Sequence, residues 1–236
     1  MNERINMDFS RAYTQYLVQV QYLRSLGSIP DLDVGESRML EVLASGWLKE
    51  EPITVMVAMV MVPEISTNTA HRRITSLLKK GMIDLVTDGE DRRIKYIVPT
   101  KATQDYFAKL GRCMGGPQTS TANYGRQYIK YVRKAEAARR IPIFQKLDVN
   151  DMIMLDSWGV AWHNNVPMGV IKALSLISNR ATSSSVSRLH GLRSLGMIDL
   201  VQDDKDRRTK YILPTQLTQR YFAKLGRCIH QSLATH

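Results

Sequence analysis

The stretch Gly81–Cys113, GMIDLVTDGEDRRIKYIVPTKATQDYFAKLGRC, occurs twice in the chain. At an offset of 115 residues, Gly196–Cys228 reads GMIDLVQDDKDRRTKYILPTQLTQRYFAKLGRC, with 25 of 33 positions identical and no gap. In each copy, two short runs of β-branched and aromatic residues flank a charged tip, which predicts a β-hairpin. Because two strands this short are only marginally stable alone, the hairpin must pack against another part of the chain.

The repeat predicts two domains. A chain of 236 residues fits two domains of ordinary size, and the one stretch rich in Gly, Pro, Ser and Thr, residues 114–123, lies between the copies. We therefore predict one domain at residues 1–115 and a second at residues 116–236.

Apolar periodicity and capping residues predict the elements around each hairpin. In the first repeat they indicate helices at about 7–26, 32–48, 53–64, 67–80 and 100–113. The β-branched residues of 53–64 are also typical of a strand, but the equivalent segment 168–179 contains Lys172, so a helix is favoured. Each repeat then has four helices, a β-hairpin and a helix. The predicted fold class is mainly α with small β-hairpins (α+β).

The composition indicates the class of partner. The formal net charge is +11, which favours nucleic acid first and an anionic membrane second. The two cysteines, Cys113 and Cys228, are too few for a disulfide framework and indicate a reducing compartment. The N-terminus carries no secretory signal, and the longest apolar run, 53–62, is about half of a membrane span. We expect a cytoplasmic, nucleoid-associated protein without membrane contact.

The helix before the first hairpin has the character of a DNA-reading element. Its apolar residues fall on one face, and Asn68, Arg72, Thr75, Ser76 and Lys79 fall on the other. Asn and Arg can both make bidentate contacts with base edges, although an ordinary solvated face would look similar. The equivalent helix of the second repeat has mainly serines there, so an asymmetric or partly shape-read site is expected.

The order of these elements resembles the MarR/SarA superfamily of winged-helix transcription regulators. The resemblance rests on LDVGESRMLEVL at 32–43, STNTAHRRITSLLKKG at 66–81 and the hairpin motif DxxDRR followed by PTxxT, and it recurs in both repeats. It implies two tandem winged helix-turn-helix domains related by a pseudo-two-fold axis, so that one chain acts as a pseudo-dimer. The chain is a fusion, like the two-domain members of the SarA group, and each repeat lacks the long C-terminal helix usual in MarR dimers.

The resemblance also implies a function. Family members place the fourth helix in the major groove and a wing arginine in the minor groove, which makes this chain a sequence-selective regulator of transcription bound to double-stranded DNA. Asp91 and Asp206 would hold the shape of the two wings. The implied DNA-binding residues are Thr67, Asn68, Thr69, His71, Arg72, Thr75, Arg92, Arg93 and Lys95 in the first repeat, and Ser183, Ser184, Ser187, Arg188, His190, Arg207, Arg208 and Lys210 in the second.

Two other functions stay open at this point: an adaptor that binds proteins through its winged helices, and an architectural protein that binds DNA without sequence preference. The sequence contains no nucleophile–base pair, phosphate-binding loop or metal-ligand spacing, so no enzyme, catalytic residue, cofactor or metal site is predicted. A small-molecule effector bound between helices is a family-level expectation. The chain is expected to be a monomeric pseudo-dimer or a homodimer.

Overall fold

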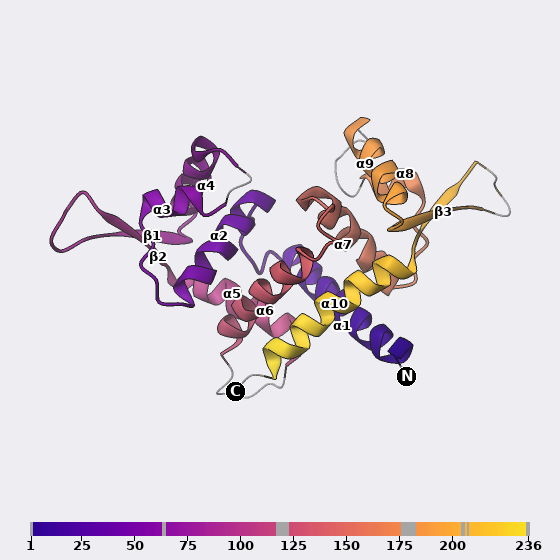
Figure 1. Cartoon of the computed structure of the whole chain (residues 1–236), viewed down its shortest axis with the longest axis horizontal. Helices are drawn as coiled ribbons and strands as arrows, with labels where there is room; N and C mark the ends of the chain where they lie inside the picture. Colours follow the sequence, from indigo (N-terminus) through magenta and orange to yellow (C-terminus); the bar gives the residue numbers. More distant parts are fainter. Residues whose placement is uncertain are drawn as a thin grey trace. The chain divides into compact units, whose positions relative to one another are not determined.

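A computed structural model describes residues 2–62, 65–116, 123–175, 183–203, 206 and 208–234 (Figure 1). These residues are mainly helical and form two small antiparallel β-hairpins, in agreement with the predicted fold class. The predicted linker falls largely on 117–122, which lie outside the described residues. In chain order the elements are α1 (Asn2–Ser25), α2 (Val34–Trp47), α3 (Val55–Val60), α4 (Thr67–Lys79), β1 (Ile83–Thr87), β2 (Lys95–Pro99), α5 (Lys101–Cys113), α6 (Tyr124–Arg139), α7 (Val149–His163), α8 (Val170–Ser175), α9 (Ser183–Ser194), β3 (Ile198–Gln202), β4 (Lys210–Pro214) and α10 (Gln216–Leu233).

The helix boundaries follow the capping residues in the sequence. The Asp33 carboxylate accepts the Glu36 amide at 2.8 Å, and the Glu36 carboxylate accepts the Asp33 amide at 2.8 Å, which is a complete capping box. Asp148 and Asp151 form the equivalent box at α7. Ser66 caps α4. The helix predicted at 53–64 is confirmed for Val55–Val60 (α3), whereas Thr54 forms a β-bridge with Tyr96 and residues 63 and 64 lie outside the described residues.

Each hairpin packs one face against its repeat. Ile83 pairs with Pro99 and Thr87 with Lys95, so β1 and β2 are antiparallel along their whole length. The Ile97 amide also donates to the Ile53 carbonyl at 2.8 Å, which adds a short third segment beside β2. Ile83 and Ile97 are 2 % and 1 % exposed. The marginal stability of two short strands is thus offset by burial of their inner face.

Contacts divide the chain into two compact units that do not coincide with the predicted domains 1–115 and 116–236. Residues 23–134 form one unit, which contains β1 and β2 and is called here the N-hairpin unit. Residues 2–22 and 135–234 form the other, which contains β3 and β4 and is called the C-hairpin unit. Most of α1 therefore packs with the second repeat, and the first part of α6 packs with the first repeat. The internal repeat reveals the duplication, but it carries no information about which copy a helix packs against.

The exchanged helices make equivalent contacts in the two units. In the C-hairpin unit, the Tyr13 hydroxyl donates to an Asp156 carboxylate oxygen at 2.8 Å. In the N-hairpin unit, the Tyr128 hydroxyl donates to a Glu41 carboxylate oxygen, also at 2.8 Å. Tyr13 and Tyr128 are 115 residues apart, as are Glu41 and Asp156, so the same contact is formed twice with the donor and acceptor repeats reversed.

Two glycines allow the exchanged helices to pack closely. A Cβ atom at Gly226 of α10 would lie 1.8 Å from the carbonyl oxygen of Phe9 in α1. A Cβ atom at Gly111 of α5 would lie 2.0 Å from the carbonyl oxygen of Tyr124 in α6. Because no side chain fits at either crossing, glycine is required at these two equivalent positions. No helix in the described part of the chain combines the length and the apolar character of a membrane-spanning segment.

Candidate nucleic-acid interface

The outer face of α4 is polar and cationic, as its sequence predicts. Ala70, Ile74 and Leu77 are 0 %, 2 % and 0 % exposed and fix the inner face of the helix. The opposite side exposes Asn68, His71, Arg72 and Lys79, whereas Thr75 is half-buried. Thr67 is also exposed, and Thr69 is half-buried because its hydroxyl and amide both contact the cap residue Ser66. The helix therefore presents long hydrogen-bond donors away from the core.

A shallow hollow of about 350 Å³ lies on this face of α4. It is lined by His71, Arg72, Thr75, Ser76 and Lys79. Arg72 and Lys79 supply positive charge, while the hydroxyls and the imidazole can donate or accept hydrogen bonds. Such a mixture suits phosphate oxygens and base edges. Lys79 was placed on this face by the sequence, two turns after Arg72, but is not among the residues that the family resemblance implies for DNA binding; it is exposed here.

A buried carboxylate connects α2 to α4 beneath this surface. Glu36 is 3 % exposed and accepts hydrogen bonds from Lys80 Nζ at 2.6 Å and Ser76 Oγ at 2.5 Å. Burial raises the pKa of Glu36, but the bonds from Lys80, Ser76 and the Asp33 amide outweigh it, so the pKa lies below its ordinary value. Lys80 and Ser76 thus fix the orientation of α4 on α2.

The tip of the first hairpin is held by two aspartates. Asp88 accepts the amides of Glu90 at 2.8 Å and Asp91 at 3.0 Å and the Tyr96 hydroxyl at 3.0 Å. The backbone bonds from Asp91 and Glu90, with that of Tyr96, lower the pKa of Asp88. The Asp91 carboxylate accepts the Arg93 amide at 2.9 Å, which is the shaping role expected for Asp91. Hydrogen bonds from backbone amides of the tip to its own two aspartate side chains therefore hold the tip in one shape.

Cationic side chains project from this ordered tip. Arg92 is exposed, and the Arg93 side chain is 94 % exposed although its Nε lies 3.4 Å from Asp91. Lys95 is exposed at the first position of β2. An ion pair with this much exposure contributes little to stability, so the arginines remain available to an anionic partner.

The second hairpin repeats this design. Asp206 accepts the Arg208 amide at 3.0 Å and the Thr209 hydroxyl at 2.9 Å, in line with the expected role of Asp206. Arg208 and Lys210 are exposed. Arg207 lies outside the described residues, so its predicted contact has no structural counterpart here.

The outer face of α9 differs from that of α4. Ser183 is the first residue of α9, and Ser184, Ser187 and His190 are exposed further along it. Arg188, predicted to contact DNA, instead donates to Asp148 at 2.5 Å and to Asp151 at 3.2 Å, and its side chain is 33 % exposed. The pKa of Arg188 is raised, chiefly by the hydrogen bond to Asp148. These two carboxylates are far from Arg188 in sequence, so the helical pattern of α9 could not reveal the ion pair.

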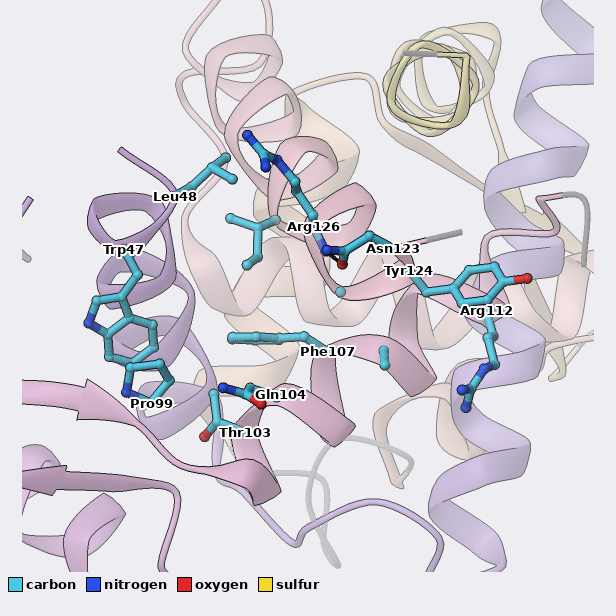
Figure 2. A pocket seen from close by; sticks show the side chains of 13 residues that line it. Trp47, Leu48, Pro99, Thr103, Gln104, Phe107, Arg112, Asn123, Tyr124 and Arg126 are labelled. Atoms are coloured by element: carbon cyan, nitrogen blue, oxygen red, sulfur yellow. Dashed lines mark hydrogen bonds between the residues drawn. The ribbon is translucent and has the colours of Figure 1, made fainter. Parts of the chain in front are cut away.

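The N-hairpin unit also contains a pocket of about 630 Å³ (Figure 2). Trp47 and Leu48 at the end of α2, Phe107 in α5 and Ile129 in α6 supply its apolar wall, and Arg112 and Arg126 supply charge. In the C-hairpin unit, the positions equivalent to Leu48 and Ile129 are His163 and Thr14. Their side chains are hydrogen-bonded at 2.8 Å, so polar groups in direct contact replace two apolar wall residues.

The remaining reactive groups are packed. Cys228 is buried and Cys113 is half-buried, and burial raises the pKa of the Cys113 thiol, which disfavours the reactive thiolate. Within the described ranges, His, Cys, Asp and Glu form no group of three or more that could hold a metal ion.

A scan of the sequence against protein-family models found no match, and a search of curated proteins found no similar sequence.

Proposed function

We propose that the chain is a sequence-selective regulator of transcription that binds double-stranded DNA through two tandem winged-helix elements. In this proposal α4 and α9 enter major grooves, and the β1–β2 and β3–β4 hairpins reach into minor grooves. The observation that carries the proposal is the pairing, within one compact unit, of the cationic hollow on α4 with an ordered hairpin tip that presents Arg92 and Arg93.

Electrostatics supports nucleic acid as the partner. The net charge is +11, and exposed cations lie on both hairpins. Lys and Arg side chains that neutralise phosphates release counterions, so affinity falls with salt with a slope of about −0.9 per phosphate contacted on double-stranded DNA. The tip of the first hairpin requires no ordering on binding because Asp88 and Asp91 already fix its backbone.

The packing of α1 with the second repeat, and of the first part of α6 with the first repeat, supports the proposal that one chain acts as a pseudo-dimer. Each compact unit contains residues of both repeats, so the two halves of the chain are joined by packed helices as well as by the linker. The expected small-molecule effector is included in the proposal, because the pocket of the N-hairpin unit combines an apolar wall with Arg112 and Arg126.

Binding to a labelled random duplex at low and high salt tests the proposal. We expect tight binding at low salt, a steep loss at high salt, and a strong decrease on replacing Arg92 and Arg93 by alanine. Lys101→Ala is the matched control, because Lys101 is an exposed cation of the same unit that pairs with Asp105 on α5. Absence of binding at low salt would favour the protein-binding adaptor. Equal affinity for all competitor sequences would favour the architectural protein.

A further inference from the structure

The two repeats differ at the positions that would face the bases. Arg72 of α4 corresponds to Ser187 of α9, His71 corresponds to Val186, and Lys79 corresponds to Ser194. All six side chains are exposed, so the difference lies on the surface and not in the core. Three long or ionisable side chains are replaced by two short hydroxyls and one apolar group.

Of the two arginines in α9, Arg193 is exposed and Arg188 is bound to another helix. Arg188 is held between Asp148 and Asp151 at the N-terminus of α7, in the same repeat. In the first repeat, Lys80 and Ser76 donate hydrogen bonds to Glu36, which is the equivalent of Asp151. Arg73, the equivalent of Arg188, is half-buried with its guanidinium beside Gly35 in α2, whereas Arg72 is exposed. The carboxylates at the helix N-terminus therefore take different partners in the two repeats.

The hairpins do not share this asymmetry. Asp91, Arg92 and Arg93 have the counterparts Asp206, Arg207 and Arg208, and Lys95 has the counterpart Lys210. The backbone-holding bonds from Arg93 to Asp91 and from Arg208 to Asp206 are also equivalent. The two halves are thus matched for contacts with the sugar-phosphate backbone and unmatched for contacts with bases.

We infer that the protein recognises an asymmetric DNA site and binds it in one orientation, with α4 reading one end through Arg72 on a guanine and α9 holding the other end without base preference. This inference rests on the proposed function. Arg is suited to the O6 and N7 acceptors of guanine, whereas a serine hydroxyl both donates and accepts and so distinguishes bases poorly. A symmetric dimer on a palindrome has no preferred direction; a chain with one base-reading helix does.

Selection of bound duplexes from a random pool tests this with the full chain. We expect one strongly defined half-site next to a half-site of weak preference. Arg72→Ser should lower the preference for the defined half-site about 5- to 150-fold, the range for loss of one bidentate base contact. Ser187→Arg should create a second defined half-site in inverted orientation. Lys79→Ser is the matched control, because it removes one charge from the same face and should weaken all sequences equally.

Orientation is measured by DNA cleavage from a tethered iron chelate. The chelate is attached to Gly89→Cys on the first hairpin tip, where a Cβ atom meets nothing within 4 Å, in a chain whose two native cysteines are replaced by alanine. We expect cleavage beside the defined half-site alone. Two identical half-sites, cleavage at both ends, or binding without any preference would overturn the inference and leave DNA binding intact. Failure of the unmodified chain to bind any duplex at low salt would overturn the proposed function as well.

Discussion

The Tyr13 hydroxyl donates a 2.8 Å hydrogen bond to Asp156, a residue 143 positions away in the other repeat. The mirror contact, from Tyr128 to Glu41, has the same length. Aromatic contacts accompany both bonds, since Tyr13 lies 5.4 Å from Phe222 and Tyr128 lies 5.6 Å from Phe107 between ring centroids. The N-terminal helix of each repeat is therefore a structural part of the other repeat.

Removing either hydroxyl is expected to destabilise the unit that contains it. Tyr13→Phe and Tyr128→Phe each leave a carboxylate without its phenol donor, at a cost of about 1–3 kcal/mol in the free energy of unfolding. Chemical denaturation followed by fluorescence measures the effect. Because the two bonds lie in different compact units, the double variant should lose about the sum of the single losses. Unchanged midpoints in both single variants would contradict the exchanged packing.

The helix crossings give a second prediction on stability. Gly226→Ala and Gly111→Ala force a methyl group against the backbone of Phe9 or Tyr124 and should cost about 1–3 kcal/mol or more. Gly191→Ala is the control, because Gly191 is an exposed residue of α9 whose added Cβ meets nothing within 4 Å. This control should gain up to about 1 kcal/mol from helix propensity. Equal effects at the three positions would rule out close crossings.

The pKa of Glu36 predicts an acid-sensitive step in stability. Because this pKa is lower in the folded chain than in the unfolded chain, the carboxylate stabilises the fold above its ordinary pKa, and the contribution is lost as pH falls through the folded value. Denaturation of Glu36→Gln as a function of pH should show a shallower acid limb than that of the unmodified chain. An identical acid limb would show that the bonds from Lys80 and Ser76 do not couple to folding.

A variant of the first hairpin tip can distinguish the effect of net charge on DNA binding from the effect of the ordered tip backbone. Asp88→Ala makes the chain more positive by one charge, so simple electrostatics predicts tighter DNA binding. We expect weaker binding, because the variant removes the acceptor of the Glu90 and Asp91 amides and the Tyr96 hydroxyl and so loosens the tip. Fluorescence anisotropy with one duplex at fixed salt measures the sign of the change. Tighter binding would show that the shape of the tip does not matter.

Local structure was predictable from the sequence because its determinants are local. Asp33 and Glu36 are three residues apart and form a capping box, and Gly81, which follows α4, adopts a φ of +66°, as is common for a glycine at a helix end. The inner face of α4 follows from residue spacing alone. The exposed position of Arg72 follows from its place on the outer face of the helix, and that of Arg93 follows from its place at the charged hairpin tip.

Long-range partners were not predictable. The ion pair that holds Arg188 involves carboxylates 37 and 40 residues away, so helical periodicity placed Arg188 on a surface without showing that it is engaged there. The boundaries of the two compact units were not predictable for the same reason. Residues 1–115 and 116–236 are sequence repeats, whereas the packing of α1 depends on complementarity with α7 and α10, which no local pattern records.

The exchanged α1 helix imposes an order on biosynthesis. Residues 23–134 contain every part of the N-hairpin unit, whereas α1 packs with α7 and α10, which are translated after that unit. At ordinary elongation rates of about 5–20 residues per second, the stretch from the end of α1 at Ser25 to the start of α10 at Gln216 takes roughly 10–40 s to translate. The side chains of Tyr13, Tyr16 and Val20, all buried in the folded protein, are exposed in the nascent chain until the rest of the C-hairpin unit follows. The amphipathic helix α1 is therefore translated well before α7 and α10, the helices that it packs against.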